Sequence, residues 1–535
     1  MHTSLNLSPP QSIRCSIPRQ LTLLPRLFKD TGGYSVRGFG KWHLGHFTDA
    51  VTPTRRGFDS FIGFYTGSMF QNAQPRIFQT TLRSCKTRKC SGLHRNLVAG
   101  TGAQMIREVA GQPTLVYSSS RVAEESTDLF LANRAREAIE NTPRDSPLFV
   151  YLSWAMPHFP MFSPTRYVRS IQNQNLTIHS GDHSGISFCR GTLPNRLLLM
   201  GAISVLDEAH RIVIDALDRT GRFRDDTLIV FTTDNGGDTP RRYGPTSTAC
   251  SVGSNYPLRG GKSTWFEGGI RLTSLVHSRG MIPLTKRGTT DESLISIADW
   301  KTTLLSATGH ALHSNQREFD FDHWPRFSSP QTASANQTRS ELVLQNWSEG
   351  KSYVVYFVDQ DDDENKKVYK LIKSDPLLGT GGGYLGVLDP TYAHAEIEPP
   401  PEMPLAEILA SGYHVTTSPP TSHKCRPPHG CLFDVSDDPQ EMINMVDHLN
   451  NTSNGGSSGK TAALLSRGNG ILAQHAAFEV AFTRSNMCDW AYYPSQTLFA
   501  MDPKGVRYAS QCKAWVPWVK DNGRYKTKRD CPKFI

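Results

Sequence analysis

A short glycine-rich stretch, Gly38 to His46 (GFGKWHLGH), holds residue types that can do chemistry at close spacing. Lys41 supplies a fixed positive charge, and the imidazole of His43 can donate or accept a proton near neutral pH. The glycines permit backbone conformations that other residues avoid, and Trp42 is a bulky apolar anchor, so the stretch suits a preorganised site. Taken alone, however, a lysine and a histidine in a loop are more often solvated surface.

A second candidate is the run Asp234-Asn235-Gly236-Gly237. Carboxylate and carbonyl oxygens are the ligands that a hard divalent cation prefers. The same four residues also make a common turn after a strand. Local spacing therefore leaves a cation site and a plain turn both open.

His158 lies between Pro157 and Phe159, and Lys262 follows two glycines. Each of these residues alone is typical of an ordinary loop. Combined with Lys41, His43 and an oxygen-rich cation site, they would form a pocket for an oxyanion. Such a pocket suits a sulfate or phosphate ester.

The elements that must position these residues can be read from apolar spacing. Leu21 to Asp30 predicts a helix that stops at Gly32-Gly33, and Tyr34 to Phe39 predicts a short strand. Ser126 to Asn141 predicts an amphipathic helix capped by Ser126 or Thr127, and Pro147 to Trp154 a buried strand. Lys41, His43 and His158 therefore follow predicted strand ends.

The next segments repeat this alternation. Leu193 to Arg219 predicts a long helix, Thr227 to Thr232 a buried strand, Ile270 to His277 another strand, and Leu294 to Ala307 a helix. Strands alternating with helices indicate an α/β fold, a doubly wound and mostly parallel sheet covered on both faces. Because ligands bind beyond the carboxyl ends of such strands, we expect His43, His158, Asp234 and Asn235 at one edge.

Beyond about Arg317 the composition changes to Ser-, Asn- and Gln-rich stretches with short strands such as Tyr353 to Val358. We therefore predict two domains: residues 1–317, with the parallel sheet, and residues 318–535, a smaller α+β domain with an antiparallel sheet. Asn450 to Lys460 (NNTSNGGSSGK) predicts a flexible linker.

Composition limits the classes of partner. The 535 residues are 38% hydrophobic and 20% charged, which is typical of a globular protein, and the net charge of +9 favours anionic partners. The basic residues are scattered, and the run Lys520 to Lys533 lacks interleaved aromatics, so we expect no nucleic acid partner. No apolar run is long enough to span a membrane, and nothing indicates an oligomeric state.

Cysteines and sequons favour the secretory pathway. Ten cysteines include the close pairs Cys85/Cys90 and Cys425/Cys431 without any Cys-x-x-Cys, so disulfides are a simpler reading than zinc. Potential glycosylation sites are Asn175, Asn336, Asn346, Asn450 and Asn451. Met1 to Gln20 nevertheless has no apolar core and does not resemble a signal peptide.

The order of these motifs resembles that of the sulfatase family, and arylsulfatase B-like enzymes (N-acetylgalactosamine-4-sulfatase-like) in particular. The resemblance covers Leu21 to Met445. The matching segments are Gly33 to Gly45, Pro53 to Phe61, Thr233 to Gly237, Pro257 to Lys262, Trp265 to Arg271 and Leu432 to Asn444.

The resemblance implies an alkaline-phosphatase-like fold and a sulfuric ester hydrolase. By position, Asp234 and Asn235 would bind one calcium ion, Lys41 and Lys262 the sulfate oxygens, and His158 the sulfate or the leaving oxygen. His43 would assist the nucleophile, which in the family is a formylglycine made from a cysteine in Cys-x-Pro-x-Arg. The implied substrate is a sulfated polysaccharide, such as a 4-sulfated galactosaminoglycan, or a small sulfate ester, and the implied location lysosomal or extracellular.

Two parts of the family pattern are missing. No aspartate pair and no Cys-x-Pro-x-Arg precede Lys41, and Cys15-Ser16-Ile17-Pro18-Arg19 has its proline one place late. We therefore expect an N-terminally incomplete sulfatase with no nucleophile, an incomplete calcium site and no activity.

Two alternative readings of the chain remain. One is a non-catalytic relative that binds sulfated ligands through Lys41, Lys262 and His158. The other is a zinc phosphatase or phosphodiesterase of the same superfamily, which is disfavoured because its site needs more His and Asp ligands.

Overall fold

The structure is a computed structural model. It describes residues 14–15, 17, 19, 21–45, 49–65, 106–115, 126–158, 163–174, 195–224, 226–238, 253, 255, 257–262, 264–310, 320–329, 338–346, 352–359, 366–373, 425, 430–448, 455–479 and 488–489. Among these residues, no helix combines the length and the apolar character needed to cross a bilayer.

The chain divides into two compact units. The N-terminal unit comprises Asn6–Leu176, Leu197–Asp225 and Phe482–Ile535. The C-terminal unit comprises Met1–Leu5, Thr177–Arg196 and Asp226–Ala481. This second unit contains residues from both sides of the predicted boundary at residue 317, and that boundary stays a prediction.

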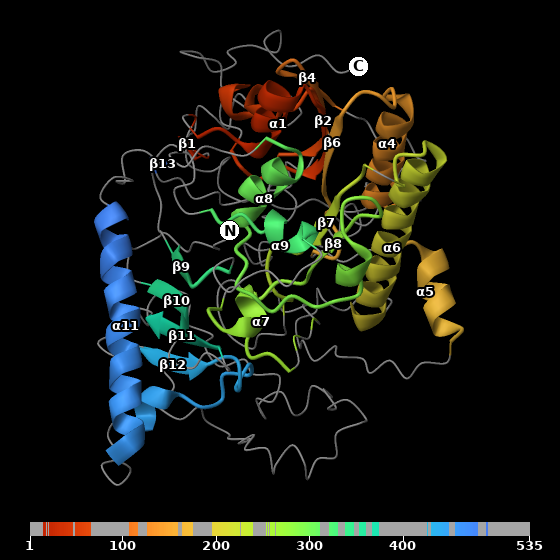
Figure 1. The fold of residues 1–535 in the computed structure, drawn as a ribbon. Helices are drawn as coiled ribbons and strands as arrows, with labels where there is room; N and C mark the ends of the chain where they lie inside the picture. Colours follow the sequence, from red (N-terminus) through yellow and green to blue (C-terminus); the bar gives the residue numbers. More distant parts are fainter. Residues whose placement is uncertain are drawn as a thin grey trace, which may run out of the picture. The chain divides into compact units, whose positions relative to one another are not determined.

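The N-terminal unit contains a five-stranded mixed sheet, of which Figure 1 labels β2, β4 and β6. Its strands, in the order β5-β4-β3-β2-β6, are β5 (Gln112–Leu115), β4 (Ile106–Val109), β3 (Ser60–Phe64), β2 (Ser35–Lys41) and β6 (Leu148–Ser153). Strand β2 pairs in parallel with both β3 and β6, whereas β4 is antiparallel to β3 and to β5. The parallel part of the sheet thus contains the strand that ends at Lys41.

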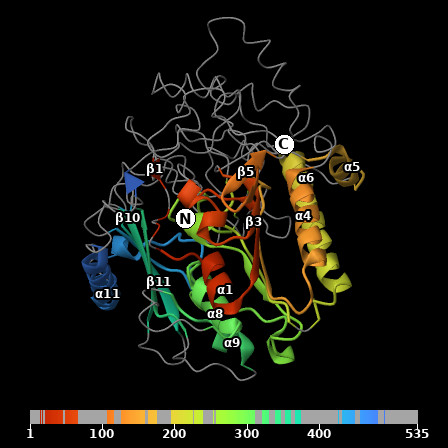
Figure 2. The same ribbon diagram turned by 90° about the horizontal axis from the view of Figure 1, so that it is seen from above.

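The described helices of the N-terminal unit are α1 (Leu24–Gly32), α4 (Thr127–Asn141), α5 (Thr165–Gln172) and α6 (Asn195–Arg219). The predicted cap of α4 is confirmed, because the Leu129 N–H donates to Ser126 Oγ at 3.2 Å. Helix α1 ends at Gly33, whose φ of 62° is left-handed. Helices α4 and α6 lie side by side in both ribbon views and share a core in which Leu129 packs with Val205 (Figures 1 and 2).

Two strands that the sequence predicts to be buried are only partly so. Most residues of β6 are half-buried, and Tyr151 is 45% exposed. The four residues of β7 (Ile229–Thr232) are also half-buried. The physical reason is their place in the sheets: among the described strands β6 pairs only with β2, and β7 only with β8 (Ser274–His277). A strand with one free edge cannot be enclosed as a central strand is.

Strands β7 and β8 also differ from the expectation of one parallel sheet. They form a separate antiparallel pair in the C-terminal unit, with Val230 opposite Val276. The strand predicted from Ile270 begins only at Ser274, because α7 (Glu267–Ile270) occupies the preceding residues. The helix predicted from Leu294 likewise begins later, as α8 (Asp299–Ala307), and is followed by α9 (Trp324–Ser328).

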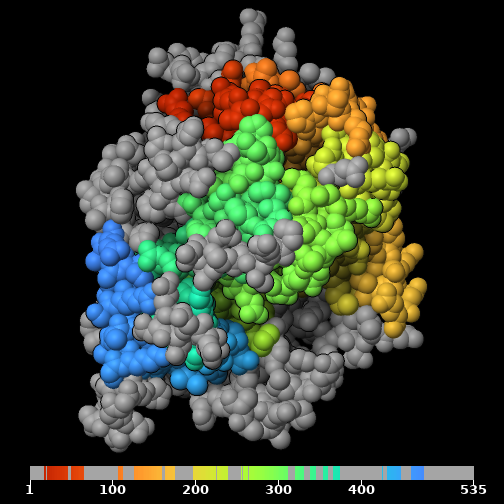
Figure 3. All heavy atoms as spheres, in the orientation of Figure 1, coloured from red at the N-terminus to blue at the C-terminus, as the bar shows by residue number. Residues whose placement is uncertain are grey.

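The antiparallel sheet predicted for the C-terminal region is confirmed. Its order is β12-β11-β10-β9, and every pairing is antiparallel. The strands are β9 (Glu341–Asn346), β10 (Ser352–Asp359), β11 (Lys367–Lys373) and β12 (Cys431–Asp434). Helix α11 (Gly455–Glu479) packs on one face through a core that includes Phe357, Leu371 and Leu464. Figure 3 shows the blue atoms of α11 beside the teal atoms of the strands.

Helix α11 overturns part of the predicted linker at Asn450 to Lys460, because the helix begins at Gly455. The glycines and serines of its first turns are poor helix formers. The helix is stabilised instead by the burial of Leu464, Leu465 and Ile471 against the sheet, which tertiary packing provides and local propensity does not.

Of the two cysteine pairs singled out in the sequence, Cys425 and Cys431 form a disulfide across six residues. Cys85 and Cys90 lie outside the described residues. Among the sequons, Asn346 is the last residue of β9, and the other four lie outside the described residues.

Candidate functional site

The loop after β2 is held against β3 by backbone hydrogen bonds and by a buried tryptophan. The Trp42 N–H donates to Phe64 O at 2.9 Å, and the His43 N–H donates to Tyr65 O at 3.0 Å. The Trp42 indole is 6% exposed and donates to Gly45 O at 2.8 Å. Trp42 is therefore the anchor that the sequence indicated for this loop.

The backbone around Lys41 takes conformations that few residues adopt. Gly40 has a φ of 103°, and a Cβ there would lie 1.9 Å from Ser153 O on the adjacent β6. His43 has a φ of 50°, which is left-handed and uncommon for a residue with a side chain. Unusual backbone of this kind persists where the surroundings fix it, and it marks a candidate functional position. Lys41 is half-buried and the His43 side chain is exposed.

The exposed His158 lies beyond the end of β6, in a loop that is held by Asp128. Asp128 stands in the first turn of α4 and is completely buried. Its carboxylate accepts from the Ala155 N–H at 2.9 Å and from the Met156 N–H at 2.7 Å, and the His158 N–H donates to Ala155 O at 3.1 Å. Burial raises the pKa of the Asp128 carboxyl to about 6, although both backbone donors favour its charged form.

The structure thus places three predicted site residues at the carboxyl ends of two adjacent parallel strands. His43 follows β2 and His158 follows β6, and Gly40 and Ser153 are opposite one another in the strand register. Lys41, which we expected beyond the strand, is instead the last residue of β2, because the pairing with β3 continues to Phe64. Sequence reasoning missed Asp128, because an acidic residue in the first turn of a helix is ordinary there and only the tertiary contact reveals its role.

In the C-terminal unit, Asp234 and Asn235 follow the end of β7. The exposed Asp234 begins the turn, and the Asn235 amide donates to Gly236 O at 2.9 Å. Within the described part of the chain, the buried Asn235 Oδ1 accepts no hydrogen bond. A buried acceptor without a donor is uncommon in proteins, and an amide oxygen of this kind is a ligand for a hard cation. The donor types of Asp234 and Asn235 therefore fit calcium.

The Lys262 loop is tied directly to this turn. The Lys262 N–H donates to Gly237 O at 3.0 Å. Asn255 joins the same two segments, because its Oδ1 accepts from the Gly237 N–H at 2.8 Å and its Nδ2 donates to Gly260 O at 3.1 Å. The structure therefore brings Asp234, Asn235 and Lys262 together through Gly237. Asn255 also lay outside the sequence prediction, since its contact with Gly237 spans 18 residues.

Backbone segments approach so closely here that side chains are excluded. The Gly236 N–H donates to Gly269 O at 3.0 Å, and a Cβ on Gly236 would lie 1.8 Å from Gly268 O. The turn after β7 and α7 are consequently in backbone contact.

The six predicted site residues form two groups, one in each unit. A single pocket made by both groups stays a prediction. Among the described residues, no three His, Cys, Asp or Glu side chains gather in a way that would hold a metal ion. Cys15, the cysteine nearest to the expected nucleophile motif, lies in β1 (Arg14–Cys15), which pairs with β13 (Cys488–Asp489).

Comparison with known proteins gives matches to sulfatases. The chain is 30% identical over 334 residues to arylsulfatase J of Mus musculus, a match of 61% of this chain and 46% of that protein. It is 26% identical over 309 residues to N-acetylgalactosamine-6-sulfatase of Homo sapiens, with 57% and 48% covered. The chain thus spans about half the length of the curated relatives it matches.

Two solved structures have the same fold at low sequence identity. The PsFucS1 sulfatase from Pseudoalteromonas sp. matches with a TM-score of 0.54 and 17% identity, covering 85% of this chain and 72% of that one. Ps i-CgsB matches with a TM-score of 0.53 and 17% identity, covering 86% and 76%. The predicted alkaline-phosphatase-like α/β fold class is confirmed. The family model described as Sulfatase matches residues 2–310, more than half of the sequence, and the chain therefore belongs to the sulfatase family.

Proposed function

We propose that this chain belongs to a calcium-dependent hydrolase of sulfated sugars and carries the sulfate-binding and calcium-binding residues of its site. The observation that carries the proposal is the backbone hydrogen bond from the Lys262 N–H to Gly237 O, which ties the segment of Lys262 to the turn of Asp234 and Asn235. An anion-binding cation beside oxygen ligands for a metal is the arrangement that a sulfate ester requires.

The residues would divide the work as follows. Asp234 and Asn235 would hold calcium, which when bound supplies positive charge that stabilises a negatively charged oxygen. Lys41 and Lys262 would bind sulfate oxygens as point charges. His158 would contact the sulfate or the leaving oxygen, and the hydrogen bonds of Asp128 to its loop would orient it.

The nucleophile is the part for which this sequence supplies no residue. None of its ten cysteines stands in a Cys-x-Pro-x-Arg motif. Positioning and charge stabilisation alone do not complete a covalent route without an activated nucleophile. We therefore propose that the 535-residue chain binds sulfate, binds calcium weakly through Asp234 and Asn235, and does not turn over sulfate esters.

The proposed substrate class is a sulfated polysaccharide. The net charge of +9 favours a polyanion. Among the relatives, the human protein named above is an N-acetylgalactosamine-6-sulfatase, and Ps i-CgsB has been solved with k-i-k-neocarrahexaose. The specific substrate that we propose is a galactosaminoglycan sulfated at position 4, as the arylsulfatase B-like motifs suggest. We also propose that the protein is located in the secretory pathway.

Calcium titration calorimetry tests the metal part of the proposal. Asn235→Ala should abolish calcium binding, whereas Asn235→Asp, which keeps an oxygen at this position, should retain it. Lys262→Ala should weaken sulfate binding, and Lys286→Ala, the same charge change elsewhere in the unit, should not. Equal calcium affinity in the wild-type chain and Asn235→Ala would remove the proposed site.

A chromogenic aryl sulfate tests the proposed lack of turnover. The 535-residue chain should release no more product than its Lys41→Ala variant, and clear turnover would refute the claim. The missing motif also favours a second candidate, a non-catalytic protein that binds sulfated ligands. If any longer form encoded by the same gene also fails to hydrolyse the ester but binds a sulfated oligosaccharide, this second candidate is correct.

A further inference from the structure

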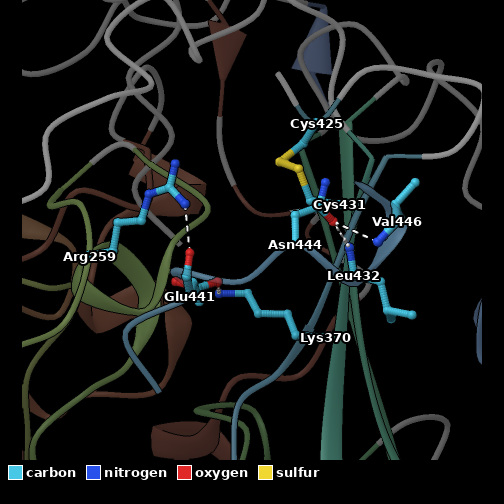
Figure 4. The surroundings of a disulfide bond; sticks show 8 residues. All are labelled: Arg259, Lys370, Cys425, Cys431, Leu432, Glu441, Asn444 and Val446. Atoms are coloured by element: carbon cyan, nitrogen blue, oxygen red, sulfur yellow. Dashed lines mark hydrogen bonds and ion pairs between the residues drawn. A yellow bond between two sulfur atoms is a disulfide. The ribbon is translucent and has the colours of Figure 1, made fainter. Parts of the chain in front are cut away.

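A buried charge cluster connects the antiparallel sheet of the C-terminal unit with the segment that carries Lys262. Lys370 of β11 is fully buried, and its Nζ lies 2.9 Å from Glu267 Oε1 and 2.7 Å from Glu441 Oε1. The Glu267 N–H donates to Glu441 Oε2 at 2.5 Å, and the Tyr356 hydroxyl donates to Glu267. Figure 4 shows the Lys370 side chain directed at Glu441. The Lys370 ammonium thus forms ion pairs with two carboxylates, Glu267 and Glu441, that are far apart in the sequence.

This arrangement is costly, and packing alone does not require it. Taking charged groups out of water is unfavourable, and apolar residues of similar volume often fill such a space with equal or greater stability. Burial raises the pKa of Glu441 to about 7, while Lys370 and Tyr356 hold the pKa of Glu267 below its ordinary value despite its burial. Glu441 also has a left-handed φ of 55°. The cluster therefore favours one arrangement of these charged side chains, at a cost in stability.

The cluster continues into the residues on both sides of Lys262. Arg259 Nη1 donates to Glu441 O at 2.7 Å, and its guanidinium carbon lies 3.9 Å from the centre of the Phe266 ring. The Gly268 N–H donates in turn to Arg259 O at 2.7 Å. Residues 259 and 267 are thus both bonded to Glu441, and Lys262 lies between them in the sequence. Figure 4 shows the bond between Arg259 and Glu441.

From this loop the contacts reach the turn after β7. Gly269 accepts from the Gly236 N–H, and the Lys262 N–H donates to Gly237 O. Glu267 is separated from Asn235 by two residues of α7, one hydrogen bond and one residue of the turn. Backbone and hydrogen bonds thus connect the cluster with the turn after β7.

We propose that Lys370, Glu267 and Glu441 are positioning residues that hold the Lys262 loop and the Asp234–Asn235 turn in register with each other. They contact neither proposed ligand themselves. The inference uses the proposed function only in that calcium serves as one of its two probes.

The test combines hydrogen exchange with calcium titration on the full chain. Lys370→Met removes the shared ammonium and leaves two carboxylates facing each other. We expect faster amide exchange in residues 234–238 and 259–271, and calcium affinity weaker by about tenfold, the scale seen when partners that orient metal ligands are removed. The matched control is Arg339→Met, which breaks another ion pair in the same unit, with Asp299. It should alter exchange around residues 294–299 and leave residues 234–238 unchanged.

A gentler variant applies if Lys370→Met does not fold. Glu441→Gln keeps the shape but has one acceptor oxygen, so it can serve either Lys370 or the Glu267 N–H. We expect the same pattern of exchange at smaller amplitude.

Three results decide the proposal. Faster exchange at 234–238 in the cluster variants alone supports it. If the wild-type chain binds no calcium but the cluster variants still exchange faster at 234–238, the positioning role is supported and the proposed metal site is refuted. Unchanged exchange at 234–238, or an equal change in Arg339→Met, overturns the positioning role.

Discussion

The carboxyl of Asp128 makes the stability of the N-terminal unit depend on pH in a defined direction. Asp128 is fully buried, and its pKa rises from the ordinary value of 3.8 to about 6. The folded state therefore binds this proton more tightly than the unfolded chain does. A group with a raised acidic pKa stabilises the fold at low pH, and this contribution is lost as pH rises from about 4 through about 6.

The magnitude follows from the shift. A change of one pKa unit corresponds to about 1.4 kcal/mol, so a shift of roughly two units is worth about 3 kcal/mol. Asp128→Asn cannot ionise and keeps one acceptor for the N–H groups of Ala155 and Met156. The stability of the wild-type chain relative to this variant should therefore fall by about 3 kcal/mol between pH 4 and pH 7.

Hydrogen exchange of peptides covering residues 126–158 measures this difference for the N-terminal unit alone. Groups such as His210, whose pKa is lowered mainly by burial, titrate equally in both proteins and cancel in the comparison. A difference that does not change with pH, or that grows as pH rises, would refute the reasoning. Asp128→Ala serves as the control for the hydrogen bonds, because it leaves both N–H groups unpaired and, like Asp128→Asn, cannot ionise. It should therefore be less stable than Asp128→Asn by about 1–3 kcal/mol at every pH.

Three further variants test packing in the described structure. Gly236→Ala should destabilise the C-terminal unit and abolish calcium binding, because its Cβ would lie 1.8 Å from Gly268 O; unchanged calorimetry would contradict this. Leu371→Ala empties a fully buried position in the core beneath α11 and should cost about 2–5 kcal/mol in urea unfolding, with a smaller loss indicating a core that collapses. Arg211→Ala removes exposed ion pairs, one of them to Glu208 at 2.6 Å, and should change the free energy of unfolding by less than about 1 kcal/mol; a larger loss would show that these surface pairs are strong.

Local signals in the sequence predicted the elements that carry the candidate site. Ser126 caps α4 as its side chain and position indicated, and Gly33 ends α1. The strands that lead to His43 and to His158 were also predicted, although the first extends to Lys41 instead of ending at Phe39. These features depend on neighbouring residues, which a single sequence displays directly.

Burial and long-range contacts could not be predicted in the same way. The apolar run of β6 reads as a covered strand, but its exposure depends on which strands pair with it. Helix α11 begins among glycines and serines that suggest a linker, because its stability comes from the sheet. The contacts of Glu267 with Lys370 and with Glu441 span 103 and 174 residues, so no local pattern marks them.

The close approach of the turn after β7 to α7 changes what an intact motif means. At Gly236 and Gly268 a Cβ would fall within 1.8 Å and 2.4 Å of a backbone oxygen, so the fold itself demands glycine there. A descendant that had lost all turnover would still need those glycines in order to fold. In a survey of such chains, the glycines of these motifs thus indicate only that the fold is retained. Side chains such as Lys262 and Asn235 are the ones that indicate whether selection still maintains the chemistry.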